Sequence, residues 1–306
     1  MKDKCNREIK HIRLSVTSKC NFDCLYCDKE GFIPQTSELT IDEIKRVSKI
    51  LANILQVKRI KLTGGEPLCR QEIVKIVKEI NDLSLYDDIS MTTNGYILEE
   101  KAKNLKKAGL NRVNVSLCSL DPETFKMITG ANALEKVLRG LQKAKEVGLF
   151  PIKLNYVMLK GVNDNELDNM IEFSAQNHYI LQIIELHQSS ECAKNKNEFF
   201  NKFYHNIDPI IKNLESRAIE TIIRGEMQNR KVFILPNSGV VETIKPSHDF
   251  CKNCTKLRVG CDGNLFGCLY RSDMGRNLKD VLNNQQSLEK YESIVNEVVN
   301  SRQPYY

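Results

Sequence analysis

Hydrophobic and polar residues alternate along several short segments in the first 190 residues. In the earliest of them Ile12, Leu14 and Val16 share one face of an extended chain, and the polar residues between them share the other. Segments of this kind, bounded by turn residues, are typical of β-strands. The pattern predicts strands at His11–Thr17, Lys58–Thr63, Ile89–Thr93, Arg112–Leu117, Ile152–Leu159 and Ile180–Leu186.

Helical patterns separate these strands. The first helix opens with the capping box Thr40-x-x-Glu43, and Gly109 and Gly148 stand where glycines commonly end helices. Repeated strand–helix units predict an α/β fold with a parallel sheet, and six of them predict a partial (βα)6 TIM-type barrel. The predicted helices are Ile41–Leu55, Gln71–Leu83, Leu98–Ala108, Ala133–Val147 and Glu166–Gln176.

The alternation also indicates what lies inside the barrel. Parallel strands covered on both faces are usually hydrophobic throughout. Here the apolar face can pack under helices, while the Arg, Lys, Thr, Ser and Asn residues of the other face line a lumen. We therefore predict a binding cavity. A sheet exposed on one side is the alternative, and it is disfavoured because all the helices would have to crowd onto one face.

The strand–helix rhythm stops near Asn195, which divides the chain into a barrel at residues 1–190 and a C-terminal region at residues 191–306. We expect the second part to be an α+β extension of the barrel. Its predicted elements are a helix at Glu198–Leu214, strands at Ile219–Ile223, Val232–Leu235 and Val240–Ile244, and a last helix at Leu288–Asn300.

Composition narrows the class of protein. The chain has 306 residues, of which 41% are hydrophobic and 27% charged, as in ordinary globular proteins. No apolar run approaches the ~18 residues of a membrane span, and the N-terminus is charged, so we predict a cytoplasmic protein. The net charge of +6 suits a small anion and weak nucleic-acid contact equally. Seven of the eleven cysteines form two tight groups, which favours metal binding over disulfides.

The first cysteine group follows the first predicted strand as Cys20-x3-Cys24-x2-Cys27. Three thiolates at this spacing can hold three irons of a cubane cluster and leave the fourth iron open to a small molecule. A structural zinc site is the alternative, but zinc usually takes four protein ligands. Because no His or fourth Cys lies nearby, we interpret the motif as a 4Fe-4S site.

The second group consists of Cys251, Cys254, Cys261 and Cys268. Four cysteines also suit structural zinc, which stays open as an alternative. Asp262-Gly263 predicts a two-residue hairpin turn in which Cys261 pairs with Asn264, and Cys268 would then lie ~13 Å from Cys261 along the strand. We therefore expect Cys251, Cys254 and Cys268 to bind a second cluster without Cys261.

The first motif resembles that of the radical S-adenosylmethionine (SAM) superfamily, in which an aromatic residue, here Tyr26, precedes the third cysteine. The resemblance implies a 4Fe-4S cluster on Cys20, Cys24 and Cys27 whose open iron binds SAM, and reductive cleavage to a 5′-deoxyadenosyl radical. The segment Gly64-Gly65-Glu66-Pro67 resembles the one that contacts the SAM amino group, and Ser116 matches another SAM-binding position.

Cys251-x2-Cys254-x13-Cys268 behind such a barrel resembles the GTP 3′,8-cyclase family of molybdenum cofactor biosynthesis. This resemblance implies conversion of GTP to 3′,8-cyclo-7,8-dihydro-GTP and a second 4Fe-4S cluster whose open iron takes the guanine ring. It also implies a homodimer, an external electron donor and a cyclic pyranopterin monophosphate synthase that receives the product, with no nucleic-acid or membrane partner. Further matching motifs are Arg13-x-Ser-x-Thr17, Thr92-Thr93-Asn94-Gly95, Lys153-x-Asn155-x-Val157 and Gly161-Val162-Asn163.

A triphosphate carries close to four negative charges, so its site requires Arg and Lys side chains. The polar strand faces and the second cysteine segment supply them, and we expect them to converge on the lumen. By resemblance, Arg258 is also a catalytic residue. The cations are Arg13, Arg59, Lys61, Lys153, Lys256 and Arg258, and the residues that match substrate-binding positions are Arg13, Lys61, Thr92, Lys153, Lys256, Leu257 and Arg258.

Three positions depart from the family pattern. Gln182 stands where an arginine is common, His187 where a methionine is common, and the chain ends Arg302-Gln-Pro-Tyr-Tyr306 instead of in a Gly-Gly tail. Two alternatives therefore stay open. Another radical SAM enzyme with a twitch-type auxiliary cluster, acting on a peptide or other substrate, would share both cysteine groups. A non-enzymatic zinc and nucleic-acid binding protein would share only the cysteines and the positive charge.

Overall fold

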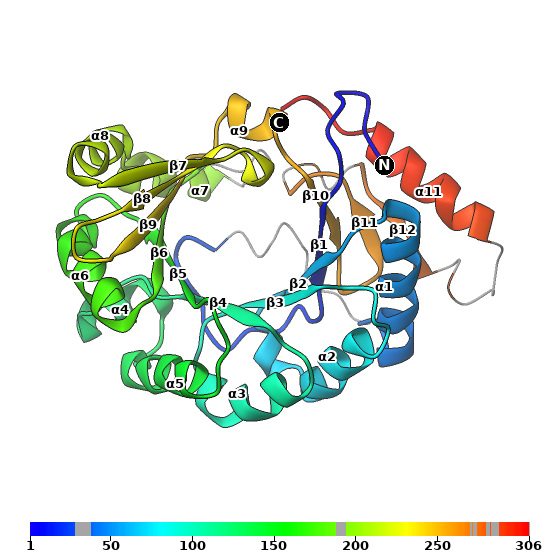
Figure 1. Cartoon of the computed structure of the whole chain (residues 1–306), viewed down its shortest axis with the longest axis horizontal. Helices are drawn as coiled ribbons and strands as arrows, with labels where there is room; N and C mark the ends of the chain where they lie inside the picture. Colours follow the sequence, from blue (N-terminus) through cyan, green and yellow to red (C-terminus); the bar gives the residue numbers. More distant parts are fainter. Residues whose placement is uncertain are drawn as a thin grey trace.

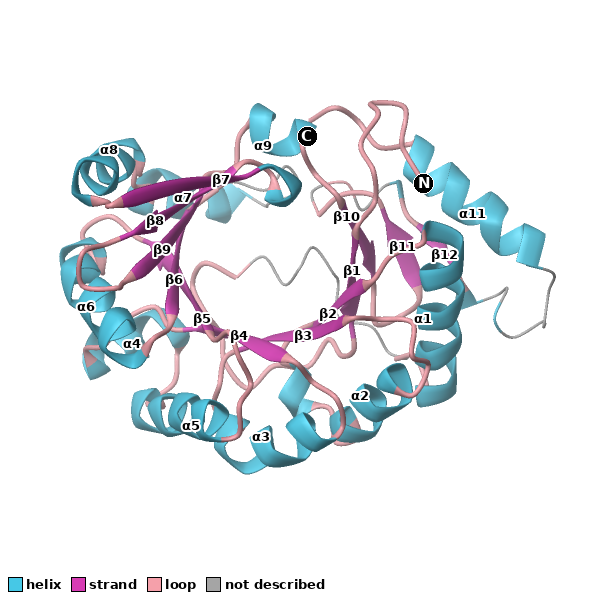
Figure 2. Cartoon of the chain, viewed as in Figure 1, coloured by secondary structure: helices cyan, strands magenta, loops and turns pink. Residues whose placement is uncertain are grey.

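The computed structural model describes residues 1–27, 38–187, 194–269, 271, 274–279, 282 and 288–305. One sheet runs through this part of the chain and curves around a central space, with helices on its outer side (Figures 1 and 2). Its strands are β1 His11–Ser15, β2 Arg59–Thr63, β3 Asp88–Thr93, β4 Arg112–Ser116, β5 Lys153–Met158, β6 Ile180–Glu185, β7 Glu220–Arg224, β8 Arg230–Ile234, β9 Val240–Ile244, β10 Lys256–Val259, β11 Asn264–Phe266 and β12 Arg276–Asn277.

The strand order is β12-β11-β10-β1-β2-β3-β4-β5-β6-β9-β8-β7. Strands β1 to β6 are parallel neighbours, which confirms the predicted partial barrel. Two strands from the C-terminal region continue it in parallel: β9 pairs with β6, and β10 pairs with β1. The C-terminal region thus builds the two flanks of the same sheet, and its side chains reach the same interior.

The helices between the parallel strands cover the outside of the barrel because each presents a buried hydrophobic face to the sheet. The capping box of α1 is present, since Glu43 N donates to Thr40 Oγ1 at 3.2 Å and Thr40 N donates to Glu43 Oε2 at 2.7 Å. The helices are α1 Ile41–Leu55, α2 Ile73–Asn81, α3 Leu98–Lys107, α4 Pro122–Thr129, α5 Leu134–Glu146, α6 Leu167–Asn177, α7 Lys194–Phe203, α8 Asp208–Arg217, α9 His248–Lys252 and α11 Leu288–Asn300.

The single helix predicted at Glu198–Leu214 is wrong. The chain forms α7 and α8 there, separated at residues 204–207. Pro209 lies in the first turn of α8, where its missing N–H costs nothing, whereas inside a continuous helix its ring would clash with the preceding turn. Helix α4 was not predicted, although Asp121 caps it by accepting from Thr124 N at 2.8 Å and Pro122 follows directly.

The hairpin of β10 and β11 has a register one residue away from the predicted one. Arg258 pairs with Phe266 and Val259 with Leu265, and Gly260 N donates to Asn264 O at 2.7 Å. The connection is therefore a three-residue loop, with Gly263 in the left-handed conformation (φ 89°) that such loops require. The predicted pairing of Cys261 with Asn264 is wrong because this loop, not a two-residue turn, closes the hairpin.

Candidate active site

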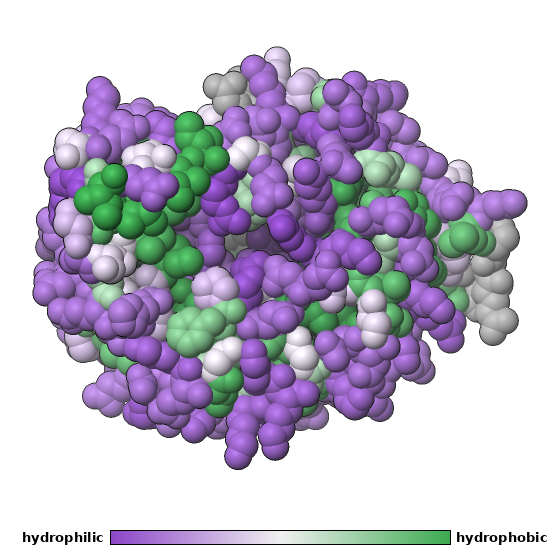
Figure 3. All heavy atoms as spheres, in the orientation of Figure 1, coloured by the Kyte–Doolittle hydropathy of each residue, from purple (hydrophilic) through white to green (hydrophobic). Residues whose placement is uncertain are grey.

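A cavity of about 890 Å³ lies inside the curved sheet. The strand faces predicted to be polar line it, including Arg13, Lys61 and Asn114, whereas the alternating Leu14 and Leu62 are fully buried on the helix side. In the space-filling view the middle of one face is hollowed, and hydrophilic residues surround much of the hollow (Figure 3). The predicted lumen, lined by the polar strand faces, is thus confirmed.

Strand register brings the cations of this wall together. Side chains that are directly paired across neighbouring strands point to the same side of a sheet. Arg13 is paired with Arg258 on β10 and with Lys61 on β2. Asn114 is paired with Lys153, and His11 with Lys256. Residues far apart in the sequence therefore form one positively charged wall.

The first cysteine group lies at the carboxyl end of β1, where Cys20, Cys24 and Cys27 all line the cavity. Burial, together with the neighbouring Cys27 and Cys20 thiols, raises the pKa of Cys24 to about 12. Tyr26 is hydrogen-bonded to Cys24 through its side chain and also lines the cavity. Thiol groups gathered in one partly open loop fit the ligand set of an iron–sulfur cluster.

Gly64 and Gly65 hold this cysteine loop against the barrel. Gly65 N donates to Thr17 O at 2.9 Å. A Cβ at Gly64 would lie 2.3 Å from Thr17 O, and one at Gly65 would lie 2.3 Å from Lys19 O. Because real Cβ contacts do not come so close, only glycine fits these positions. The glycine pair therefore allows a close approach to the cysteine loop itself, in addition to its predicted role toward SAM.

Glu66 joins three motifs beneath the loop. Its buried carboxylate accepts from Thr93 Oγ1 at 2.7 Å and from Asn94 N at 2.6 Å, while Glu66 N donates to Lys19 O at 2.8 Å. Burial raises the pKa of this carboxyl to about 7, against the opposing effect of its hydrogen bonds. Ser116, predicted to bind SAM, and Thr92, predicted to bind the substrate, also line the cavity. Gly64, Gly65, Glu66 and Ser116 thus lie at the carboxyl ends of β2 and β4.

Two lysines of this wall, Lys61 on β2 and Lys256 on β10, lie among arginines. Lys61 Nζ donates to Asn114 Oδ1 at 3.0 Å, and Lys256 Nζ donates to Gln228 Oε1 at 2.6 Å. Burial lowers the pKa of both ammonium groups well below the ordinary range, and nearby arginines lower it further. A bound anion would relieve this repulsion. The side chain of Leu257 instead lies in the hydrophobic core with 0% exposure and does not line the cavity, which leaves its backbone for the predicted substrate contact.

Sequence reasoning missed a buried ionic group that continues this wall through Asn114 and Gln182. Glu242 is 0% exposed, and its Oε2 accepts from Lys153 Nζ at 2.6 Å and from Gln182 Nε2. Nη1 atoms of Arg224 and Arg230 each lie 3.6 Å from its Oε1. A carboxylate inside the otherwise apolar and Thr-containing strand Val240–Ile244 was the available signal, because a buried charge requires partners.

The arginines of this group also line the cavity. Lys153, Arg224 and Arg230 face a single carboxylate, so the group retains a net positive charge. Arg224 and Arg230 thereby supply guanidinium groups on the side of the cavity where Gln182 departs from the family's arginine.

Cys251, Cys254 and Cys268 line a second cavity of about 90 Å³ at the amino end of β10. Phe250, Lys256 and Arg258 border both cavities, so the two are adjacent. Although burial alone would raise it, the pKa of the Cys254 thiol is lowered by the positive charges of Lys256 and Arg302. A thiol environment that favours the thiolate fits a metal ligand.

Cys261 lies at the other end of β10. It does not line the second cavity, its carbonyl accepts from Leu39 N at 2.7 Å, and its side chain is hydrogen-bonded to Ser15. Among the residues that the structure describes, no three or more His, Cys, Asp or Glu side chains are grouped for one metal ion. A cubane cluster distributes its thiolates over separate irons.

Residues 14–174 match the model of the Radical SAM superfamily, and residues 179–306 match that of Molybdenum Cofactor Synthesis C. The fold is similar to Streptococcus suis SuiB bound to S-adenosylmethionine (TM-score 0.63, 13% identity, 94% of this chain and 68% of that one). It is also similar to anSMEcpe with bound AdoMet and Cp18Cys peptide (TM-score 0.62, 17% identity, 95% and 84%). The chain belongs to the radical SAM superfamily.

Curated relatives narrow the class further. The probable GTP 3′,8-cyclase of Thermococcus kodakarensis is 42% identical over 310 residues, which cover 99% of this chain and 99% of that protein. The probable GTP 3′,8-cyclase of Methanothermobacter marburgensis is 40% identical over 99% of this chain and 98% of its own length. That of Methanocaldococcus jannaschii is 40% identical over 100% of this chain and 99% of its own length. Within the superfamily, the chain belongs to the GTP 3′,8-cyclase family. None of the helices in the described part has the length and apolar character of a membrane span.

Proposed function

We propose that this protein is a GTP 3′,8-cyclase that converts GTP to 3′,8-cyclo-7,8-dihydro-GTP, the first step of molybdopterin cofactor biosynthesis. One observation carries this function: a cation-lined cavity has the first cysteine group at one end and borders the second at the other. A nucleoside triphosphate requires such a combination, because its phosphates need cations while its sugar and base face the cofactors.

Cys20, Cys24 and Cys27 would hold a 4Fe-4S cluster, and Gly64, Gly65, Glu66 and Ser116 lie around the space that SAM would occupy. The cluster, when bound with SAM, supplies the electron for reductive cleavage to a 5′-deoxyadenosyl radical. The chain's own part is to hold the loop through Gly65 and to orient SAM. Tyr26, at the loop, also lines the cavity.

Cys251, Cys254 and Cys268 would hold the second 4Fe-4S cluster, leaving one iron without a protein ligand. Arg258 and Lys256 border both cavities, so they lie where a nucleotide would bridge from the first cluster to the second. We expect Arg258 to touch the reacting nucleotide as a catalytic residue. The cations that would bind the phosphates are Arg13, Lys61, Lys153, Lys256 and Arg258, together with Arg224 and Arg230.

The proposal includes the expected partners. An external donor would provide the electron, and the product would pass to a cyclic pyranopterin monophosphate synthase in the cytoplasm. The functional unit would be a homodimer. A peptide-acting enzyme with two clusters would not need the cations of the wall, and a zinc and nucleic-acid binding protein would not need a cavity that contains the first cysteine motif.

Anaerobic incubation of the reconstituted protein with SAM, dithionite and GTP tests the function. We expect 5′-deoxyadenosine and a cyclised nucleotide to form together, detected by chromatography and mass spectrometry. Guanosine serves as the control substrate without phosphates and should give little product. Formation of 5′-deoxyadenosine with GTP recovered unchanged would contradict the cyclase and favour the alternative of another radical SAM substrate.

Replacing Arg258 with alanine should weaken GTP binding by about 1.5–3 kcal/mol, the usual worth of a hydrogen bond to a charged group. Guanosine binding should change little, because only the phosphate contact is removed. Calorimetric titration of both ligands measures the difference. Arg276→Ala is the matched control, since Arg276 pairs with Glu297 on α11 at the surface and lies outside both cavities. Equal losses for GTP and guanosine would show that Arg258 supports the fold instead.

Lys153 is a less suitable probe than Arg258. Its removal would leave the buried Glu242 without its 2.6 Å partner, and breaking a buried ion pair from one side costs roughly 3–5 kcal/mol. A Lys153→Ala variant would therefore lose folding stability together with affinity, so its thermal unfolding has to be measured before its GTP binding is interpreted.

A further inference from the structure

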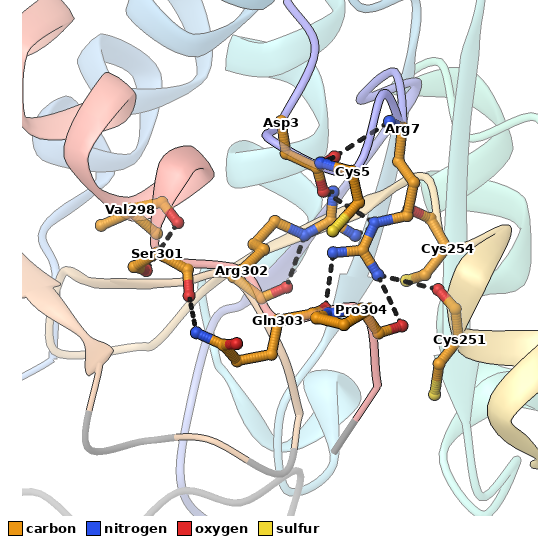
Figure 4. A network of polar contacts seen from close by, with 11 residues as sticks. Asp3, Cys5, Arg7, Cys251, Cys254, Val298, Ser301, Arg302, Gln303 and Pro304 are labelled. Carbon is orange, nitrogen blue, oxygen red and sulfur yellow. Dashed lines mark hydrogen bonds and ion pairs between the residues drawn. The ribbon is translucent and has the colours of Figure 1, made fainter.

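Two buried arginines and one buried aspartate join both ends of the chain to the second cysteine group (Figure 4). Asp3 has a fully buried side chain. Its Oδ2 accepts from Arg7 Nε at 2.7 Å and from Arg302 Nη1 at 2.9 Å. Its Oδ1 accepts from the backbone N–H groups of Cys5 and Arg7, each at 2.9 Å. The carboxylate therefore links the N-terminal segment to the chain that follows α11.

The other nitrogens of the two guanidinium groups donate to the backbone of the cysteine segments. Arg7 Nη1 donates to the carbonyl of Cys251 at 2.9 Å, and Arg302 Nη2 donates to the carbonyl of Cys254 at 2.6 Å. Arg302 Nε donates to the carbonyl of Gly267 at 3.1 Å, one residue before Cys268. An arginine therefore holds the backbone carbonyl of Cys251, that of Cys254, and that of Gly267 directly before Cys268.

Gly267 is shaped for this contact. A Cβ at that position would lie 2.5 Å from Cγ of Arg302, so a side chain there would displace the arginine. Arg7 also donates to the carbonyls of Gln303 at 2.7 Å and Pro304 at 3.3 Å. These bonds hold the last residues of the chain across the second cavity, which Gln303 and Tyr305 help to line. The tail thereby forms a wall of the cysteine site.

Stability alone does not explain why buried ionic groups hold this loop. Burying ionic groups in place of apolar side chains brings little or no net stability, and the side chains of Arg7 and Arg302 are 6% and 2% exposed. Two guanidinium groups and one carboxylate leave a net positive charge beside the cavity. Three thiolates around a cluster carry an excess of negative charge, which this positive charge would offset.

We propose that Arg7 and Arg302, bridged by Asp3, are positioning residues that hold the peptide groups of Cys251, Cys254 and Cys268 for the second 4Fe-4S cluster. The inference rests on the proposed function, because that function includes the second cluster. It adds the residues that keep the cluster site formed, and it assigns the C-terminal tail to the wall of that site. Groups that orient metal ligands typically change metal affinity about 10–100-fold when they are removed.

Anaerobic reconstitution of full-length Arg302→Ala tests the inference. We expect total iron to fall from about eight to about four per chain, because one of two four-iron clusters is lost. Electron paramagnetic resonance should lose the second signal, which GTP perturbs in the wild type, and keep the first. Formation of 5′-deoxyadenosine should persist, which shows that the barrel is folded. Arg302→Lys, which keeps the charge but not the forked donors, should retain the second cluster only in part.

Asp3→Asn provides a second measurement in case Arg302→Ala does not fold. It preserves the shape of the side chain, removes the bridging charge and replaces one of the two acceptor oxygens with an NH2 group, which cannot accept from the arginine or backbone donors around Asp3. A chelator should therefore strip iron from its second cluster about 10–100-fold faster than from the wild type. Arg276→Ala should lose iron at the wild-type rate. Wild-type iron content, signals and stripping rates in both Arg302→Ala and Asp3→Asn would overturn the inference. About four irons in the wild type itself would instead overturn the second cluster of the proposed function.

Discussion

A Cys24→Ala variant should form no detectable 5′-deoxyadenosine from SAM under reducing conditions. Cys24 is the middle member of the motif, and its thiol interacts with those of Cys20 and Cys27. Two thiolates do not hold a cubane in this loop, and without a cluster no electron reaches SAM. The measurement is anaerobic incubation with SAM and dithionite, with 5′-deoxyadenosine quantified against the wild type. Cys20→Ala and Cys27→Ala should behave in the same way.

Cys5→Ser is the matched control, because Cys5 is an exposed thiol that lines neither cavity. It should form 5′-deoxyadenosine at the wild-type rate. Each of the three loop variants should still assemble the second cluster, with about four irons per chain. Undiminished 5′-deoxyadenosine from any of them would refute the ligand assignment, and loss of all iron would show that the two sites do not assemble independently.

The barrel was predictable because its signals are local. Alternation along His11–Thr17 gave β1 and its polar face, and the capping box at Thr40 gave the start of α1. Each of these two signals depends only on residues that are close together in the sequence. The polar lumen then followed from the geometry of a strand, since alternate side chains point to opposite faces. In the structure the apolar residues of these strands are buried in the core, and Arg13, Lys61 and Asn114 of the other face line the cavity.

The C-terminal region was harder to predict because its strands find partners far away in sequence. Nothing local at Val240–Ile244 indicates that β9 pairs with β6, or that β10 pairs with β1. The hairpin register also depended on a three-residue loop that the dipeptide Asp262-Gly263 does not distinguish from a two-residue turn. The single helix predicted at Glu198–Leu214 is wrong for a simpler reason. Pro209 is a local signal for the start of a new helix, and the prediction did not take it into account.

Long-range contacts show what Gln182 and the C-terminal tail do at the positions where this chain differs from the family pattern. Gln182 Oε1 accepts from Asn114 Nδ2 at 2.8 Å, and its Nε2 donates to Glu242. This glutamine therefore joins the hydrogen-bonded wall, while Arg224 and Arg230 bring guanidinium groups from β7 and β8. Arg302 serves the second cysteine group through backbone carbonyls. Sequence spacing cannot show such contacts, because they join residues up to 299 positions apart.

Cys268→Ala and Cys261→Ser should have opposite outcomes, although both remove a thiol from the same hairpin. Cys268 follows β11 at the amino end of β10, and it shares the second cavity with Cys251 and Cys254. If the observed pairing of Arg258 with Phe266 continues, Cys268 lies opposite Lys256. Cys261 lies five residues further along, or about 16 Å at the rise of a strand. Ligands of one cubane must lie within several ångströms of each other.

Cys268→Ala should therefore lose the second cluster, so that iron falls to about four per chain, while 5′-deoxyadenosine still forms and no cyclised nucleotide appears. Cys261→Ser should keep about eight irons per chain, the GTP-perturbed signal of the second cluster, and product formation. Iron analysis and paramagnetic resonance of the two variants, reconstituted side by side, decide between an open and a closed second cluster. If Cys261→Ser lost about four irons, Cys261 would be a fourth ligand, no iron would be free for the guanine ring, and the second cluster would serve structure or electron transfer.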